Sequence, residues 1–455
     1  MSFIPLPGID ISKIFQLYFV ELLSLIYILR KYSKNKFYIL IILIFYTAIF
    51  AFAGKDIQNI YRIIILVFTL MLCSQKRAFA SFKKGDNFIT VAFVLFSLFY
   101  FYSTIRSNDN FTIILSQYSR YLVSYCLWFL VRKELFSELY PIEKLNRLIY
   151  DIFLMQIVIS IAKLIIFQGK QIEHLVGSIA HTGGSDGTTI PIYGFIFLWF
   201  YRKGNLKIND WLFVVGLMLA GFLAGKRAVW FIVPLVIAAF MIYVPKLKMN
   251  KTLWITIILA PLAFYLGVRL TPTLNPENKV WGSFELDYTF DYADKYQFGD
   301  EKRMKVDKRA QGRGGATILV WNKLTGTDLL TDDDWFGKGL TGMYTGSYTD
   351  FNKLKFGVSG KGNSTGYFQT YTTTGFAGFF TTFLLFYGIL WQFKSRRIRW
   401  VVMGIVTWEY FMYIGNTFRY PAYMFLIVYF IHYSNYFLIK SPVKMKNTLF
   451  PTYYN

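Results

Sequence analysis

Long apolar segments, separated by short polar connectors, occupy most of the chain. A helix of roughly 17 to 25 apolar residues crosses the hydrocarbon core of a bilayer. The pattern predicts segments of this kind over residues 14–29, 37–53, 60–73, 87–104, 111–131, 148–167, 187–201, 211–224, 228–244, 252–270, 370–392, 400–414 and 421–439. We therefore expect an all-α polytopic membrane protein with 12–13 transmembrane helices.

The first of these segments has two interpretations. Residues 14–29 are short for a membrane span and contain Glu21, so the pattern also fits an amphipathic helix that lies along the membrane surface. The protein has twelve spans if this segment is excluded and thirteen if it is included. Both counts predict the same orientation from residue 30 onward.

Every second connector is basic, which predicts the orientation of the chain. The positive-inside rule places connectors rich in Lys and Arg in the cytoplasm. The remaining connectors, expected on the outer side, are residues 54–59, 105–110, 168–186, 225–227, 271–369 and 415–420. The first residues, MSFIPLPGID, lack the basic region of a cleavable signal, so we expect insertion through the chain's own spans.

The connectors divide the chain into four parts. Transmembrane helices are expected over 1–270 and again over 370–439, with a cytoplasmic tail over 440–455. Between them, residues 271–369 form a long extracytoplasmic loop in which basic and acidic residues balance. A loop of this length is uncommon unless it is functional, and this one is rich in aromatic residues. We expect it to form a small helical cap over the outer face.

Composition excludes a soluble enzyme. Hydrophobic residues make up 55% of the chain and charged residues only 16%, with a mean hydropathy of +0.39. The net charge of +23 belongs to the membrane part and its cytoplasmic rim, where it sets orientation and meets anionic headgroups, so no nucleic-acid partner is expected. Cys73 and Cys126 lie inside apolar runs and predict neither a disulfide framework nor a metal cluster.

Several arginines stand where a membrane protein disfavours them. Lys226 and Arg227 occupy a short outer turn, AGKRAVW, which predicts either an anion site or side chains that reach lipid headgroups. Arg106 and Arg120 lie near the outer halves of neighbouring spans. Because a charge in a span is costly unless it is paired or solvated, each of these two marks a candidate cavity.

The long loop contains a second group of candidates. Arg313 precedes an apolar stretch that ends at Trp321, and an arginine beside a helix start suits a pyrophosphate, although an exposed arginine at an ordinary helix start fits as well. Polar and aromatic side chains near the end of the loop suit sugar hydroxyls and stacking, or else they satisfy the backbone at a helix start. They are Tyr344, Asn363, Ser364 and Tyr367.

Acidic residues and histidines supply candidates for proton transfer. His181 and Asp186, in the outer connector 168–186, could act as a general base and the residue that orients it, or they could be incidental polar residues of a surface loop. Asp332, Asp333 and Asp334 come late in the long loop, and a helix cap before Trp335 is a better interpretation than a metal site. We expect no metal.

The arrangement resembles the superfamily of O-antigen ligases and Wzy-type O-antigen polymerases over roughly residues 180–392. The resemblance depends on AGKRAVW at an outer turn, the long outer loop, Arg313 followed by Trp321, the FGKG turn at 336–339, and an NST run before the span TTTGFAGFF. It implies inverting, metal-free transfer of a glycan from undecaprenyl pyrophosphate at the outer face of the bacterial cytoplasmic membrane. Arg227 and Arg313 would then hold the pyrophosphate, with Lys226 beside them.

The chain departs from the ligase pattern at one position. Counting back from Gly375 places Ser364 where similar ligases carry a histidine, which favours a repeat-unit polymerase and leaves His181, Asp186 and Asp350 as candidate bases. The implied partners are a polyprenyl-linked glycan, membrane lipids and a chain-length regulator, and no cofactor is implied. A ligase or oligosaccharyltransferase with a lipid or protein acceptor is the first alternative, and a polysaccharide flippase or transporter is the second.

Overall fold

The computed structural model describes residues 11–49, 55–135, 142–166, 177–179, 186–223, 229–243, 261–262, 264–271, 274–298, 321, 325–326, 330–340, 365–412, 417 and 419–435. Within these ranges the secondary structure is helical and includes no strand. The elements are α1 (Ile11–Tyr32), α2 (Lys36–Phe45), α3 (Lys55–Gln75), η2 (Ala78–Ser81), α4 (Asp86–Arg106), α5 (Phe111–Leu135), α6 (Ile142–Ile166), α7 (Asp186–Tyr201), α8 (Ile208–Leu223), α9 (Val229–Tyr243), α11 (Leu286–Phe298), α14 (Asp332–Phe336), α16 (Gly366–Leu390), α17 (Arg396–Met412) and α18 (Pro421–Tyr433).

The expected all-α membrane protein is confirmed in its helical class and in its apolar helices. Among the described residues, four helical segments are long and apolar enough to cross a bilayer: 57–75, 86–106, 142–166 and 366–390. Shorter apolar helices lie at α2, α8, α9 and α18. Large hydrophobic side chains such as Leu98, Ile165 and Leu235 are exposed on the outside of the bundle, as expected where lipid replaces water. The total of 12–13 spans stays a prediction.

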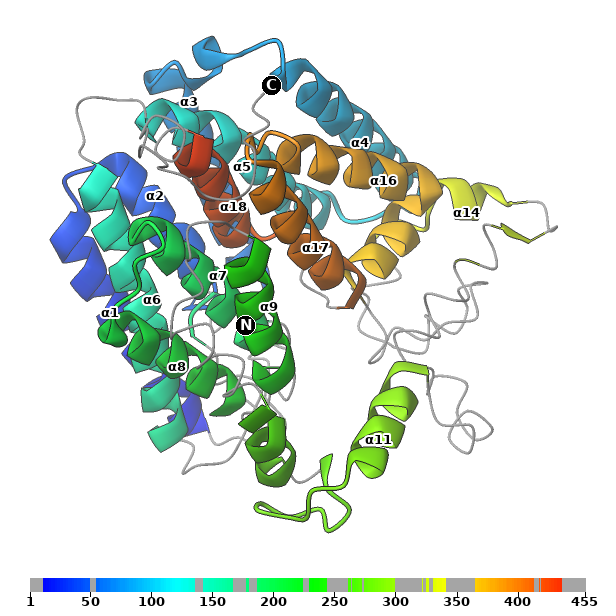
Figure 1. Cartoon of the computed structure of the whole chain (residues 1–455). Helices are drawn as coiled ribbons and strands as arrows, with labels where there is room; N and C mark the ends of the chain where they lie inside the picture. Colours follow the sequence, from blue (N-terminus) through cyan, green and yellow to red (C-terminus); the bar gives the residue numbers. More distant parts are fainter. Residues whose placement is uncertain are drawn as a thin grey trace, which may run out of the picture.

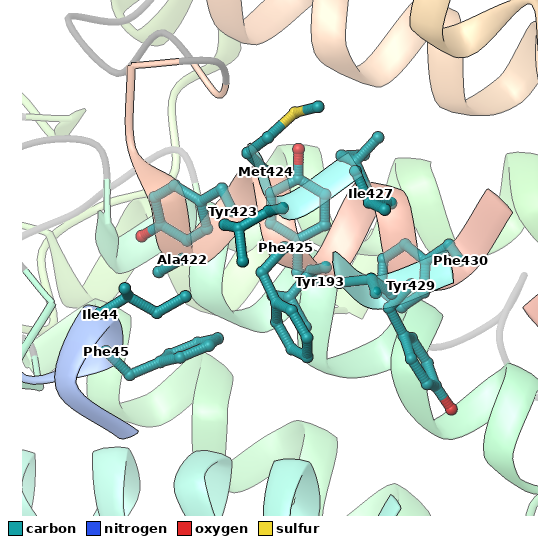
Figure 2. Close-up of a cluster of buried hydrophobic side chains, with 14 of the residues drawn as sticks. Ile44, Phe45, Tyr193, Ala422, Tyr423, Met424, Phe425, Ile427, Tyr429 and Phe430 are labelled. Atoms are coloured by element: carbon teal, nitrogen blue, oxygen red, sulfur yellow. The ribbon is translucent and has the colours of Figure 1, made fainter. Parts of the chain in front are cut away.

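Helix α18 is the centre of the bundle. Every residue from Ala422 to Tyr433 is buried, although the helix is only 13 residues long. It packs against α5, α7 and α2 (Figure 1). Figure 2 shows Phe45 of α2 and Tyr193 of α7 beside the aromatic side chains of α18, and the Phe45 and Phe425 rings meet edge to face with centroids 6.2 Å apart. Such contacts fix the helices around one aromatic core.

The first helix runs antiparallel to α6. Lys31 pairs with Asp151, and ten residues earlier on α1 Glu21 pairs with Lys163. Residue numbers therefore increase along α1 in the direction in which they decrease along α6. The two helices stay in contact over about 15 Å. Helix α6 is itself a candidate span, and whether α1 also crosses the membrane stays a prediction.

Helix α2 is shorter than the predicted segment 37–53. It ends at Phe45 after 10 residues, with Tyr46 as its C-cap. At a rise of 1.5 Å per residue this covers about 15 Å, half of the hydrocarbon core. Seven of the ten residues of α2 are buried, so it is an internal half-helix among the residues that the structure describes.

Candidate functional site

Helix α16 is interrupted at Gly375, and the interruption organises the site. Gly375 has φ 66° and ψ −166°, so the helix changes course there. The backbone carbonyls of Thr372 and Thr373 accept hydrogen bonds from the N–H groups of Lys338 (2.8 Å) and Gly339 (3.0 Å). A Cβ atom on Gly375 would lie 2.2 Å from the carbonyl oxygen of Trp335. Only glycine permits this approach of two backbones.

The N–H groups that bond to these carbonyls of α16 belong to residues 330–340, which we call the strap. Thr331 caps α14 in a capping box with Asp334, and Asp334 also accepts a hydrogen bond from the Tyr371 hydroxyl (2.9 Å). Arg106, at the end of α4, forms an ion pair with Asp333. The strap is therefore held by both α4 and α16, and α14 lies at the ends of these helices in Figure 1.

The two glycines of the FGKG turn belong to the strap. Gly337 and Gly339 have φ values of 73° and 65°, and a Cβ atom on Gly337 would lie 2.5 Å from the backbone of Thr373. The turn therefore needs glycine for the close contact with α16. The three neighbouring aspartates are first-turn residues of α14, and Asp333 is the ion-pair partner of Arg106 and Lys338. The described residues contain no group of three His, Cys, Asp or Glu side chains that could hold a metal ion.

A small cavity lies under the strap, between α4, α5 and the first half of α16. Its volume is about 20 Å³, enough for a water molecule and too small for a sugar. Hydroxyl, amide and aromatic side chains dominate the lining, which comprises Phe96, Tyr100, Gln117, Tyr121, Leu340, Gly366, Gln369, Thr370, Thr373, Thr374 and Arg419.

Arg419 supplies the positive charge of this cavity. It lies in the connector between α17 and α18 and is only 9% exposed. Its guanidinium donates one hydrogen bond to Oε1 of Gln369 and another to Oε1 of Gln117 (3.3 Å). Amide oxygens are neutral acceptors that orient a guanidinium while leaving it positively charged. A buried, oriented arginine among hydroxyl groups is suited to bind an anion.

A second arginine lies nearby on α5. Arg120 follows Gln117 by three positions, which places the two on one face of the helix. The guanidinium carbon of Arg120 lies 5.7 Å from the centroid of the Tyr420 ring, next to Arg419 in the chain. Two guanidinium groups therefore gather at one end of the bundle.

Two buried carboxyl groups lie beyond Tyr420. The Tyr423 hydroxyl donates to Oδ1 of Asp186, while Oε2 of Glu409 accepts hydrogen bonds from the Tyr193 hydroxyl (3.1 Å) and from Oγ1 of Thr417 (2.7 Å). The rings of Tyr193 and Tyr423 stack with centroids 5.4 Å apart. Asp186 and Glu409 are close enough to repel each other electrostatically, and both are 2% exposed.

Most of the site residues predicted from the sequence lie outside the described residues or away from the cavity. Trp321 is 62% exposed, and Tyr367 is buried with its ring 5.0 Å from that of Phe411, so neither lines the cavity. Arg106 holds the strap, Arg120 lies beside Tyr420, and Asp186 is buried against Tyr423. The remaining candidates lie outside the described residues: His181, Lys226, Arg227, Arg313, Tyr344, Asp350, Asn363 and Ser364.

Arg419 and Glu409 are absent from the sequence predictions. A signal for Arg419 was present, because it is a basic residue in the connector 415–420, on the side where basic residues are disfavoured. The same criterion had singled out Arg227. Glu409 could have been identified as a candidate because it is an acidic residue inside an apolar segment.

No protein-family model, no curated protein and no solved structure matches this chain.

Proposed function

We propose that the protein is a membrane glycosyltransferase, a polymerase that transfers a glycan from a polyprenyl diphosphate carrier onto an acceptor repeat unit. The observation that supports this best is Arg419, a buried and oriented guanidinium in a cavity lined by hydroxyl and amide side chains. A diphosphate needs bidentate cationic donors, and a sugar needs hydroxyl, amide and aromatic neighbours. Both kinds of group are present at this end of a bundle of apolar helices.

In the proposed reaction, Arg419 and Arg120 hold the diphosphate. An acceptor hydroxyl attacks the anomeric carbon, the bond from that carbon to the diphosphate oxygen breaks, and the configuration inverts in a single displacement. The negative charge that grows on the leaving diphosphate is stabilised by the two guanidinium groups. The proton of the acceptor hydroxyl passes to a carboxylate, for which Asp186 and Glu409 are the candidates among the described residues.

Substrate binding requires a wider cavity than the structure has. We infer that the contacts between the strap and Gly375 separate when the carrier lipid binds, because the cavity lies directly under them. Arg106 would control this step through its ion pair with Asp333. Arg227 and Arg313 remain proposed as additional diphosphate ligands from the outer turn and the long loop.

The proposed setting is the outer face of the bacterial cytoplasmic membrane, with 12–13 spans and a cytoplasmic tail. The alternating basic connectors support this orientation, because they place the strap, Arg419 and Asp186 on the outer side. No metal or cofactor enters the proposed step, since the two guanidinium groups supply the positive charge.

The test is elongation of a lipid-linked repeat unit by the purified full-length protein in detergent. Arg419→Ala is expected to lower the rate about 100- to 1,000-fold, the usual cost of losing one donor to a developing negative charge. Arg202→Ala is the matched control. Arg202 lies in the loop between α7 and α8, pairs with Asp210 of α8, and does not line the cavity. Unchanged chain length in Arg419→Ala at normal protein levels would contradict the proposal.

A ligase is distinguished by its product. Under the polymerase proposal the elongated glycan stays on the polyprenyl carrier, whereas a ligase or oligosaccharyltransferase moves it to a lipid or protein acceptor. Extraction of the products into carrier-linked and acceptor-linked fractions separates these two outcomes.

A transporter or flippase is the second candidate, and one observation favours it. Glu21 and Lys163 form a buried ion pair beside the half-helix α2, and broken helices with buried charges are typical of transporters. New glycosidic bonds formed in detergent, where no membrane separates two sides, would exclude transport as the sole activity. Movement of glycan across vesicles without any new bond would support it.

A further inference from the structure

A second polar centre lies between α1, α2 and α6, away from the cavity. Glu21 of α1 forms an ion pair with Lys163 of α6, and the two side chains are only 1% and 3% exposed. Lys163 also donates a hydrogen bond to the carbonyl oxygen of Gly177 (2.6 Å). The three helices contact one another, as Figure 1 shows.

This centre is deep in the bundle. Along α1, Glu21 precedes Lys31 by ten residues, and Lys31 marks one end through its partly exposed pair with Asp151. At 1.5 Å per residue the Glu21–Lys163 pair lies about 15 Å inside, near the middle of a hydrocarbon core about 30 Å thick. A charge pair at this depth is rare and usually functional.

Non-helical backbone surrounds the pair. Helix α2 ends at Phe45, whose carbonyl accepts a hydrogen bond from Oγ of Ser178 (3.0 Å). The backbone N–H of Ala48 donates to the carbonyl of Ser178 (3.0 Å), and Gln156 bonds to Ser178 from α6. Gly177 has φ +47°, and a Cβ atom there would lie 2.1 Å from Oε1 of Gln156. Irregular backbone at membrane depth is typical of sites that bind ions.

The carboxylate of Glu21 is only half satisfied. One oxygen meets Lys163, whereas Oε2 is buried and has no hydrogen-bond partner among the described residues. Among the described residues, the charged group that faces Glu21 is Lys163 from α6, and Tyr46 from α2 and Tyr18 from α1 are its titratable neighbours. Residues 177–179 contribute a backbone carbonyl and the Ser178 hydroxyl. A buried anionic oxygen without a donor is costly, and a proton would remove that cost.

We propose that the Glu21–Lys163 pair is a proton-binding centre, in which Oε2 of Glu21 takes a proton from hydronium and later returns it to water. An O–H bond forms on Glu21, the ion pair is lost, and Lys163 keeps its proton and its hydrogen bond to Gly177. The centre gains one positive charge in this step. Proton binding loosens α1 from α6 at this level, while the Lys31–Asp151 pair still holds their other ends together.

The proposal is independent of glycan transfer. It depends on the geometry of the pair, the half-helix and residues 177–179, and none of these lines the cavity that contains Arg419. A result for either centre therefore leaves the other unaffected.

The experiment is a pH titration of the full-length protein in detergent, followed by infrared difference spectroscopy of the carboxyl stretching band. From about pH 9 to about pH 4, a protonated carboxyl band from an apolar environment is expected to appear. Its frequency should shift when the protein contains isotopically labelled glutamate. Glu409 is another buried glutamate and can contribute to this band, so the variants are compared in a Glu409→Gln background. There the band should be lost in Glu21→Gln and retained in Asp151→Asn, the control on the same pair of helices.

Two results would overturn the proposal. One is a wild-type titration in which no labelled glutamate band appears, since this reading does not depend on whether a variant folds. The other is a band of unchanged size in Glu21→Gln, which would assign the proton to another glutamate. In either case the ion pair would be a fixed structural contact.

Discussion

Among the described residues, α16 is interrupted at Gly375 and α2 ends at Phe45 inside the bundle. The backbone carbonyls that each break leaves without a helical partner form hydrogen bonds of different kinds. At Gly375 the freed carbonyls of α16 bond to backbone N–H groups of the strap, a segment at the end of the bundle. At Phe45 the freed carbonyl of α2 bonds to the Ser178 hydroxyl beside a sealed ion pair. Buried backbone groups need partners in both places. The first arrangement can open by releasing the strap, whereas the second stays closed unless its charge changes.

The charges in the two regions show the same contrast. The guanidinium of Arg419 is held by two neutral amides next to a cavity, an arrangement that suits an external anion. Lys163 pairs with a carboxylate and donates to a carbonyl, so the chain itself already supplies its anionic partner. We therefore propose anion binding near the strap and proton binding at the deep pair.

The largest expected effect tests the deep pair. Lys163→Met should destabilise the protein by about 3–5 kcal/mol, because it leaves Glu21 as an uncompensated buried charge. Thermal unfolding in detergent measures the loss. Lys31→Met is the control, since that lysine is 48% exposed and its pair is worth only about 0–1 kcal/mol.

The pH dependence of Lys163→Met also tests the proposal that Glu21 binds a proton. The destabilisation in Lys163→Met should be greatest at high pH and should shrink as the pH falls, because a protonated Glu21 carries no charge to bury. A destabilisation of the same size at all pH values would show that the cost comes from packing around residue 163.

A smaller effect is expected at the interruption of α16. Gly375→Ala should destabilise the protein by about 3 kcal/mol, because alanine is strained at φ 66° and its Cβ would meet Trp335. Gly404→Ala is the matched control on α17, where a Cβ atom meets nothing within 4 Å. Equal unfolding temperatures for the two variants would contradict the description of the interruption.

The smallest effect is expected at the edge of the strap. Arg106→Ala should cost less than about 1 kcal/mol, because both partners are partly exposed and Lys338 stays 3.2 Å from Asp333. Limited proteolysis should nevertheless cleave the strap faster in this variant than in Arg202→Ala. Equal cleavage rates would show that the ion pair does not hold the strap.

The sequence indicated part of the candidate site. Arg106 and Arg120 were singled out because a charge in a span is costly unless it is paired or solvated, and Asp186 because an acid beside a histidine could orient a general base. The sequence did not indicate how they are used: Arg106 holds the strap, whereas Arg120 and Asp186 lie around Tyr420 and Tyr423. Partner choice depends on how each helix is rotated, which the hydrophobic pattern of a uniformly apolar segment does not encode.

By itself the sequence determined the approximate positions of most of the described apolar helices and their apolar surroundings. Apolar length and basic connectors are local properties, so they could be read one segment at a time. Tertiary structure alone decided that Arg419 meets Gln117 across 302 positions and that Ser178 meets Phe45 across 133 positions. It also decided that α2 stops at Phe45. The physical reason is that a helix can end inside a membrane only where distant parts of the chain satisfy its backbone.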